Sequence, residues 1–114
     1  MKDIKKLRHK FVIPILRKKS LSWPARNEAF KRARRDRGFY ECASCKNLFG
    51  RKEVHADHIK PVVNVKTGFT TYDNYIESLL CDVSNYAIIC HNCHSSKTTV
   101  ENNLRRLNKK KKKR

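Results

Sequence analysis

The stretch that decides the fold is Cys90-His91-Asn92-Cys93-His94-Ser95-Ser96-Lys97, which opens with a Cys-x-x-Cys pair. A second pair of the same spacing, Cys42-Ala43-Ser44-Cys45, lies upstream. Two such pairs can supply four thiolates to one tetrahedral ion, and a complete set of four leaves no open position for chemistry. We therefore predict that Cys42, Cys45, Cys90 and Cys93 bind a structural Zn²⁺ that ties the two segments together.

The size of the chain makes such a metal useful. The chain has 114 residues, of which 39% are hydrophobic, so we expect one small domain with a limited apolar core. A core of this size often needs a metal or disulfides for stability. The chain has five cysteines, and we expect the fifth, Cys81, to be a buried apolar side chain. Paired thiolate ligands favour a reducing cytoplasm, although two disulfides in an exported protein remain an alternative.

The charge of the chain indicates a polyanionic partner. Lys and Arg number 28 against 10 acidic residues, which gives a formal net charge of +18. DNA or RNA fits such a field, because neutralising phosphates releases counterions. We expect no membrane partner: the apolar run from Phe11 to Leu16 is short, contains Pro14 and is flanked by charge. No secretory signal is recognised at the amino-terminal end, so the expected location is the cytoplasm.

Apolar periodicity and turn residues divide the chain into short elements. In chain order we predict a basic arm or helix at 1–21, a helix from Ala25 to about Arg37 ended by Gly38, a strand at Phe39–Cys42, a turn at Leu48–Gly50, a strand at Lys52–Ile59, a loop at 62–71, a helix at Tyr72–Cys81, a turn at Asp82–Asn85, a strand at Tyr86–Ile89, a helix from Ser95 or Ser96 to Leu104 or Leu107, and a disordered basic tail at 108–114.

Four further polar residues lie at ordered positions around the cysteines: Asp57, His58, Asn85 and His94. Taken singly, each has a plain interpretation, such as a surface pair, a turn residue or a histidine at a helix start. Together they offer what phosphodiester hydrolysis needs, namely a base to activate water and donors for a divalent cation. An aspartate and a histidine give a mixed oxygen and nitrogen donor set, which suits Mg²⁺, Mn²⁺ or Ni²⁺.

These residues carry a family resemblance. The run from His55 to Pro61, the turn from Asp82 to Asn85, and a histidine directly after the last cysteine resemble, in this order, the HNH endonucleases, most closely small phage-type members that stand alone. The likeness spans about residues 42 to 100. It implies an α+β fold with a ββα-metal, treble-clef-like core at 39–107 inside a nuclease domain at 22–107, preceded by basic helices. Residues 62–81 depart from the common pattern, because many members have only a short link there.

The resemblance implies a role for each residue of the set. Asp57 and His94 would be ligands of the catalytic divalent cation, and His58 would be the general base, for which the ordinary imidazole pKa near 6.5 is well suited. Asn85 would brace the loop that carries the base. The products implied are a 5′-phosphate and a 3′-hydroxyl. His55 remains open between a spare ligand, a phosphate contact and an exposed strand histidine, and His91 is given no catalytic role.

Double-stranded DNA is the expected substrate. We predict that Lys97, Arg32 and Arg35 contact its phosphates, which positions the protein without reading sequence. No sequence-reading module is recognised, so we expect low sequence specificity, directed by DNA structure or by a partner such as a phage packaging or other targeting protein. Two alternatives remain: a non-catalytic zinc-ribbon protein that binds nucleic acid, and a nuclease directed at RNA.

Overall fold

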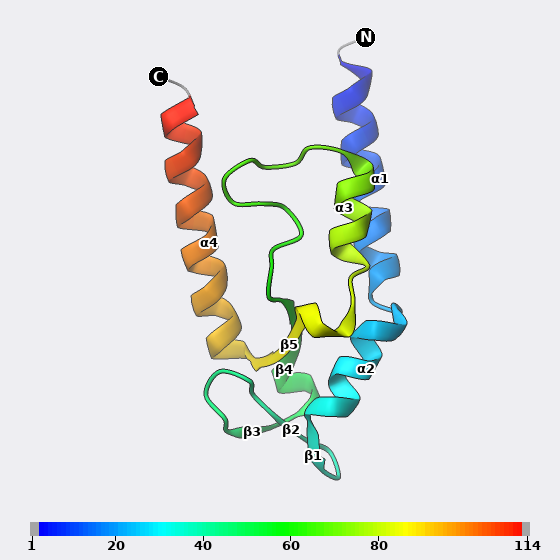
Figure 1. Ribbon diagram of the computed structural model, residues 1–114, viewed down its shortest axis with the longest axis vertical. Helices are drawn as coiled ribbons and strands as arrows, with labels where there is room; N and C mark the ends of the chain where they lie inside the picture. The colour runs from blue at the N-terminus through cyan, green and yellow to red at the C-terminus, as the bar shows by residue number, and fades with distance from the viewer. Residues whose placement is uncertain (1–2, 113–114) are drawn as a thin grey trace.

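The protein is an α+β molecule with four α-helices and two small antiparallel sheets among the residues described (Figure 1). The computed structural model describes residues 3–112, with the backbone alone for residues 110–112. The elements in chain order are α1 (Ile4–Ser20), α2 (Pro24–Ala33), β1 (Arg34–Asp36), β2 (Phe39–Glu41), β3 (Leu48–Gly50), the 3-10 turn η1 (Arg51–Glu53), β4 (Val54–His58), α3 (Tyr72–Leu79), the 3-10 turn η2 (Val83–Asn85), β5 (Tyr86–Cys90) and α4 (His91–Lys112).

The core lies where α2 covers the sheet of β4 and β5. These strands pair antiparallel, from Val54 opposite Cys90 to His58 opposite Tyr86. Apolar residues of β5 and α2 are buried here because the sheet turns one face toward the helix. The buried members of this cluster are Ala29, Phe30, Val54, Tyr86 and Ile88.

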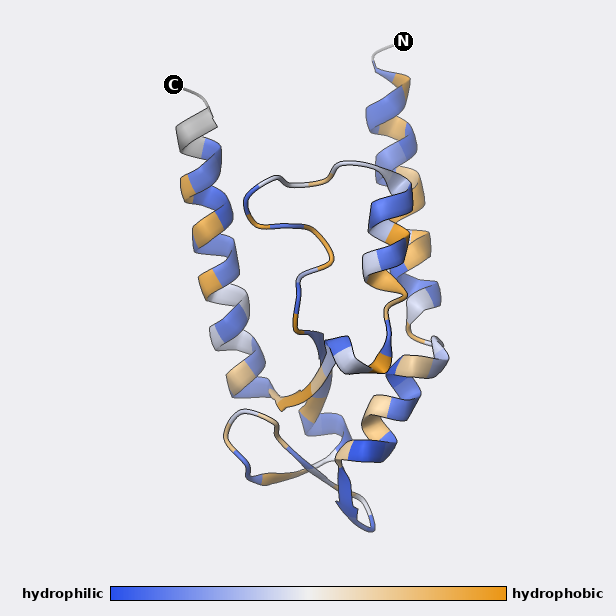
Figure 2. Ribbon diagram, in the orientation of Figure 1, coloured by the Kyte–Doolittle hydropathy of each residue, from blue (hydrophilic) through white to orange (hydrophobic). Residues whose placement is uncertain are grey.

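The two long helices extend away from this core. Figure 1 shows α1 and α4 running along the long axis, with the loop between β4 and α3 spanning the space between them. Figure 2 shows an apolar β5, whereas α1 and α4 are mostly hydrophilic with isolated apolar turns. Helix α1 is tied to α3 by Arg17, whose Nε donates to the hydroxyl of Tyr75 at 3.3 Å. Within residues 3–112, no helix combines the length and the apolar character that a membrane span requires.

Several predicted elements are present. The strand after Gly38, the strand before the second cysteine pair and the helix that begins at Tyr72 all form, the last with Thr71 as its capping residue. The basic arm at 1–21 is helical from Ile4 to Ser20, and the loop at 62–71 separates β4 from α3.

The helix predicted from Ala25 to about Arg37 is wrong at its carboxyl end. Helix α2 stops at Ala33, and Arg34 turns into β1, which pairs with β2. Gly38 has φ of 77°, a left-handed conformation that suits a glycine, and it closes the turn between β1 and β2 instead of capping a helix. The pairing of β1 with β2 therefore outweighs the helical pattern of Arg34 to Arg37. Strand β2 also pairs with β3 (Leu48–Gly50), a segment for which the sequence predicted a turn.

The last helix is longer than predicted at both ends. It begins at His91, so the second cysteine pair runs from the end of β5 into the first helical turn. It continues through Lys112, beyond Leu107 and into the predicted disordered tail, because 91–112 contains neither Gly nor Pro. The loop before α3 also holds this helix: Arg105 and Asn108 donate to the carbonyl oxygens of Val63 and Val65 at 3.0 and 2.9 Å. Lys113 and Arg114 lie outside the described residues.

Candidate metal centre and active site

Four cysteines converge at one end of the β4–β5 sheet, and we call them the four-cysteine cluster. Cys42 follows β2 and Cys45 lies one turn later, while Cys90 ends β5 and Cys93 lies in the first turn of α4. All four Sγ atoms lie within 4.8 Å of one another. The Cys45 and Cys90 sulfurs are 3.9 Å apart, and thiolates about 2.3 Å from a tetrahedral ion are separated by about 3.8 Å. The cluster is therefore placed to bind a metal and is compatible with structural zinc.

The surroundings of the sulfurs are unequal. Cys42 is fully buried, and burial opposes ionisation of its thiol. The backbone N–H groups of Cys45 and Cys90 donate to its sulfur, and these hydrogen bonds outweigh burial, so that the pKa of Cys42 is lowered to about 6. In contrast, contact with the Cys90 thiol, followed by burial, raises the pKa of Cys93 to about 12. The protein alone therefore favours a thiolate at Cys42 and a thiol at Cys93. A bound cation would displace the proton of Cys93.

Asp57, His58 and His94 line one cleft of about 710 Å³, which we call the acid–histidine cleft. Its walls come from β4, α3, α4 and the end of α1. The Asp57 side chain is 13% exposed, and its Oδ1 lies 3.9 Å from Nε2 of His94. Ligand atoms about 2.1 Å from one ion lie at most about 4.2 Å apart, so both residues can bind the same cation. The donor set and the spacing fit a divalent metal.

The His58 side chain is held in one orientation. Its Nε2 lies 3.0 Å from the carbonyl oxygen of Leu79, and its ring packs against Tyr86 with the centroids 4.8 Å apart. A carbonyl only accepts hydrogen bonds, so Nε2 must carry the proton, and Nδ1 of the neutral ring keeps its lone pair. Leu79 belongs to α3, within the inserted segment at 62–81. The insertion therefore supplies the partner that fixes the tautomer of His58.

Asn85 joins the two strands beyond their paired ends. Its Oδ1 accepts from the backbone N–H of Lys60 at 2.9 Å, and its Nδ2 donates to the Lys60 carbonyl at 3.3 Å. The backbone N–H of Ile59 also donates to the carbonyl of Asn85 at 2.8 Å. These bonds hold the segment directly after His58. Asn85 is therefore bonded to the segment that follows the proposed base, and the bracing role that the resemblance implies for it stays a prediction.

Lys97 reaches across to β4 from the second turn of α4. Its ammonium group donates to Oδ2 of Asp57 and to the carbonyls of His58 and Ile59. In this arrangement the ammonium balances the charge of Asp57 and is directed inward. The phosphate contact predicted for Lys97 would require the side chain to leave these partners, and it stays a prediction.

Two arginines of the cleft were not singled out from the sequence. Arg17 of α1 and Arg105 of α4 line the same cleft as Asp57, and each is held by a neutral oxygen, the Tyr75 hydroxyl and the Val63 carbonyl. Their basic helices were visible in the sequence, but no local pattern relates them to the cleft. Together they add positive charge beside the acid and the two histidines.

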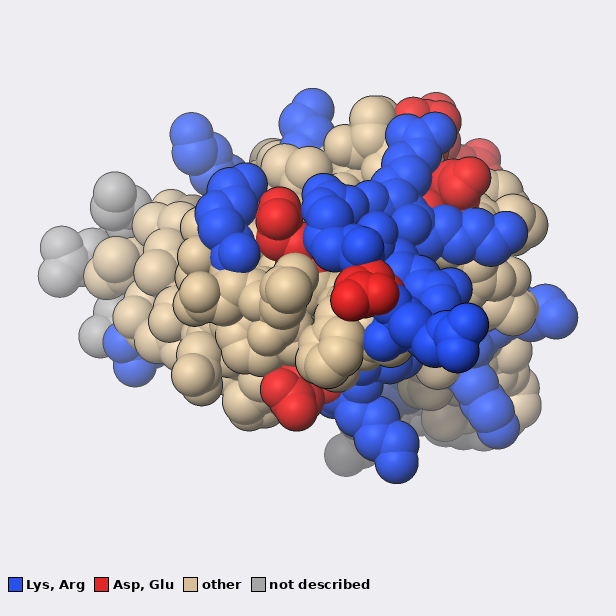
Figure 3. All heavy atoms as spheres, turned by 90° about the horizontal axis from the view of Figure 1, so that it is seen from below, with Lys and Arg blue, Asp and Glu red and all other residues tan. Residues whose placement is uncertain are grey.

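Arg32 and Arg35 lie elsewhere. With Lys46 they line a separate depression of about 370 Å³ that shares no residue with the acid–histidine cleft. Arg35 contacts Glu41, with Nε and Oε1 3.6 Å apart. Figure 3 shows basic side chains gathered on the face at this end of the molecule. The exposed basic residues of α2, of β1 and the turn after it, and of the segment from Lys46 to η1 are Lys31, Arg32, Arg34, Arg35, Arg37, Lys46, Arg51 and Lys52.

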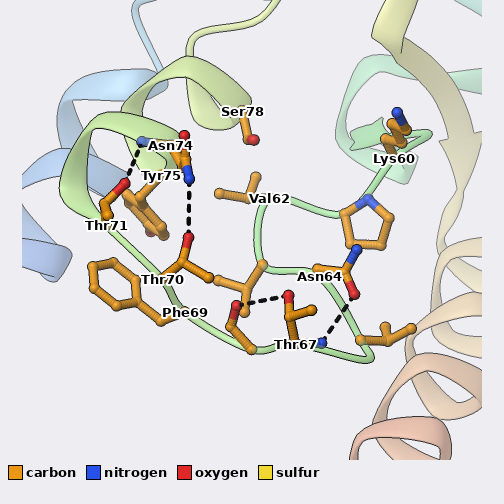
Figure 4. Close-up of a pocket in the computed structure, with 14 residues that line it drawn as sticks. Lys60, Val62, Asn64, Thr67, Phe69, Thr70, Thr71, Asn74, Tyr75 and Ser78 are labelled. Carbon is orange, nitrogen blue, oxygen red and sulfur yellow. Dashed lines mark hydrogen bonds between the residues drawn. The ribbon is translucent and has the colours of Figure 1, made fainter.

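A third cavity, of about 380 Å³, lies in the loop between β4 and α3 and is shown in Figure 4. The loop folds back on itself: Asn64 accepts from the backbone N–H of Thr67, and Asn74 donates to the hydroxyl of Thr70. Its lining is apolar side chains, hydroxyls and amides with one lysine, and it has no carboxylate, histidine or cysteine. It therefore lacks the histidine, cysteine and carboxylate donors that most protein metal sites use.

The structure thus brings the four cysteines into one cluster and Asp57, His58 and His94 into one cleft, whereas Arg32 and Arg35 lie on a different face. The Leu79 carbonyl, a backbone atom, could not be found from side-chain motifs. Comparison of the chain with protein family models, with curated proteins and with solved structures gave no match.

Proposed function

We propose that this protein is a metal-dependent endonuclease of the HNH type that hydrolyses phosphodiester bonds in DNA. The observation that supports it best is the composition of one cleft. A carboxylate and an imidazole 3.9 Å apart, suited to one divalent cation, share that cleft with a second imidazole whose Nδ1 is free to act as a base. A separate four-cysteine cluster, taken here to bind structural Zn²⁺, needs none of these residues.

The order of elements agrees with this proposal. Strands β4 and β5 pair antiparallel and run directly into α4. This is the ββα order that the resemblance implies, with Asp57 and His58 at the end of the first strand and His94 on the helix. The treble-clef-like, zinc-bound form of the core is part of the proposal.

The chemistry follows from the donor atoms. A Mg²⁺, Mn²⁺ or Ni²⁺ ion held by Asp57 and His94 would stabilise negative charge on the phosphoryl and leaving oxygens. His58 removes a proton from the attacking water through Nδ1, because Nε2 is committed to the Leu79 carbonyl. The water oxygen bonds to phosphorus as the bond to the 3′ oxygen breaks, and the 3′ oxygen takes a proton from solvent water, which leaves a 5′-phosphate and a 3′-hydroxyl.

The substrate is drawn in by charge. A net charge of +18 attracts a polyanion along its length, and Arg17 and Arg105 place part of that charge at the cleft itself. The basic face with Arg32 and Arg35 would hold phosphates further along the duplex. None of these contacts reads base edges, so low sequence specificity is part of the proposal, as is direction by a targeting partner such as a phage packaging protein.

The test is cleavage of supercoiled plasmid with Mg²⁺, Mn²⁺ or Ni²⁺. We expect nicked or linear products from the native chain and a rate lower by about 10²- to 10⁴-fold for His58→Ala, the range for loss of a general base. His9→Ala is the matched control, because His9 packs against Phe69 outside the cleft. Zinc content and the circular dichroism spectrum should be equal in all three proteins.

A parallel arm with single- and double-stranded RNA decides between nucleic acid substrates. Faster cleavage of RNA would transfer the proposal to an RNA-directed nuclease. If the native chain binds plasmid but cuts neither substrate under any of the three metals, the protein is a zinc-dependent nucleic-acid-binding module. That outcome would leave the basic face of Figure 3 as its functional surface.

A further inference from the structure

Two histidines that the proposed mechanism does not use point toward each other outside the acid–histidine cleft. Nε2 of His55, on β4, lies 3.5 Å from Nδ1 of His91, the first residue of α4. Both residues line a depression of about 400 Å³ that includes neither Asp57 nor His58. His91 is exposed and His55 is half-buried. The pair is therefore open to solvent through this depression and not through the acid–histidine cleft.

The distance between these nitrogens is informative. Nitrogen donors in proteins commonly lie about 2.7–3.2 Å from their acceptors, so 3.5 Å is long for a hydrogen bond between the two rings. Two imidazole nitrogens about 2.0–2.1 Å from a tetrahedral ion are separated by about 3.4 Å. The observed separation matches the spacing of two ligands of one metal more closely than that of a direct hydrogen bond.

The backbone fixes this spacing. In the antiparallel sheet Val54 pairs with Cys90 and His55 with Ile89, so His91, two residues after Ile89, lies diagonally across from His55 where β5 passes into α4. The ring of His55 also stacks on His94, with the centroids 4.9 Å apart and the planes inclined by 27°. The stack restricts rotation of His55 and keeps its Nε2 directed at His91.

The pair would form an open site. Within the described residues, the four-cysteine cluster is the single group of three or more histidine, cysteine or carboxylate ligands that converge closely enough for one ion. Water would therefore complete the shell of an ion at His55 and His91. Glu53 lines the same depression and could bind through such a water.

The donors also select the type of ion. Imidazole nitrogen favours late divalent metals over hard ions such as Mg²⁺ and Ca²⁺, which prefer oxygen. Arg51 and Lys52 lie nearby, and their positive charge opposes ions that bind mainly through charge. This positive charge acts on every divalent cation, so the preference for late transition metals comes from the imidazole donors themselves.

We propose that His55 and His91 form a second, solvent-open binding site for a late divalent transition metal, Zn²⁺, Ni²⁺ or Cu²⁺, distinct from both the four-cysteine cluster and the acid–histidine cleft. The inference does not depend on nuclease activity. It concerns residues for which neither the proposed catalysis nor the four-cysteine cluster has a use.

The test uses the full chain, without an affinity tag, already loaded with one zinc ion per molecule. Zn²⁺ is titrated in by calorimetry, and the histidine nitrogens are followed by long-range proton–nitrogen NMR. We expect one further ion at the pair, counted apart from any ion in the acid–histidine cleft, with changes in chemical shift at Nε2 of His55 and Nδ1 of His91. His55→Ala and His91→Ala should each weaken that binding by at least about tenfold, His9→Ala should leave it unchanged, and Mg²⁺ should give no shift at the pair.

Three results would overturn the inference. The first is a second zinc that shifts only His94, which would place it in the acid–histidine cleft. The second is the absence of a second binding event, which would leave the two rings as an unliganded contact. The third is unchanged affinity in His91→Ala, a substitution at an exposed position, in protein whose zinc content shows that the four-cysteine cluster is still loaded. Circular dichroism of each variant separates loss of a ligand from loss of the fold.

Discussion

The four-cysteine cluster and the acid–histidine cleft use ligands from the same strand–helix junction in different ways. In the cluster, four sulfurs face one point within 4.8 Å of one another, and no position is left for substrate. In the cleft, the two proposed ligand atoms, Oδ1 of Asp57 and Nε2 of His94, lie 3.9 Å apart beside about 710 Å³ of space. A closed set contributes to folding, whereas an open one leaves coordination positions for chemistry. The following predictions test this division, from the largest expected effect to the smallest.

The largest effect is expected from breaking the closed set. Cys90→Ser should abolish stoichiometric zinc binding and reduce the free energy of unfolding by several kcal/mol, because structural zinc supplies much of the stability of small domains. Thermal unfolding and zinc content measure this. Cys81→Ser is the matched control, since Cys81 packs against the apolar core and lies outside the cluster. If Cys90→Ser keeps its zinc and its melting temperature, the cluster does not have the structural role assigned to it.

The next largest effect is expected at Lys97 in the open site. Its ammonium group contacts an oxygen of Asp57, the proposed catalytic ligand. Lys97→Met should lower the free energy of unfolding by about 1–2 kcal/mol, between the values for exposed and buried ion pairs. Mn²⁺ should recover part of this loss, because it binds the carboxylate that the ammonium has left. Denaturant unfolding with and without Mn²⁺ tests both effects, with Lys31→Met on exposed α2 as the control. If Mn²⁺ stabilises Lys97→Met no more than it stabilises the native chain, the ammonium of Lys97 and the cation do not compete for Asp57.

A smaller effect is expected at the brace. Asn85→Ala removes two hydrogen bonds to Lys60, both exposed to solvent, so the loss of stability should be about 1 kcal/mol. Zinc content should not change, whereas plasmid cleavage should slow because the segment after His58 is less restrained. Asn103→Ala on the exposed side of α4 serves for comparison. Equal cleavage rates in these two variants would limit Asn85 to a structural role.

The smallest effect on stability is expected at the basic face. Arg35→Gln breaks an exposed pair with Glu41, which contributes at most about 1 kcal/mol. If Arg35 contacts one phosphate, the slope of log binding constant against log salt concentration should fall by about 1. Binding to a short duplex at several salt concentrations measures this slope. A slope equal to that of the native chain would show that Arg35 contacts no phosphate.

The two sites also differ in how far the sequence predicts them. The Cys-x-x-Cys spacing is local, so each pair brings its own sulfurs together, and only the meeting of the two pairs is left to the fold. The cleft depends on residues far apart in the chain: the tautomer of His58 depends on the Leu79 carbonyl of the inserted helix. No side-chain pattern reports the position of a backbone oxygen. No local pattern relates Arg17 or Arg105 to the cleft either, because both lie far from Asp57 in the chain.

Errors in the predicted elements follow a related rule. Arg34 to Arg37 continue a helical pattern, but pairing of β1 with β2 takes these residues out of α2. The start of α4 was placed at Ser95 or Ser96 because the second cysteine pair was interpreted as a separate turn, although Cys93 lies in the first helical turn. In both cases hydrogen bonds or packing with distant segments outweighed a local preference.

The sequence by itself determined the α+β class, the four cysteines, the basic charge and the residue types from which a hydrolytic site could be built. These depend on composition and on spacing within a few residues. Only the tertiary structure decided that Asp57, His58 and His94 share a cleft, that Lys97 turns inward onto Asp57, and that His55 faces His91. Such relations arise from the register of β4 on β5 and from the way α3 and α4 pack around it, which local sequence patterns do not specify.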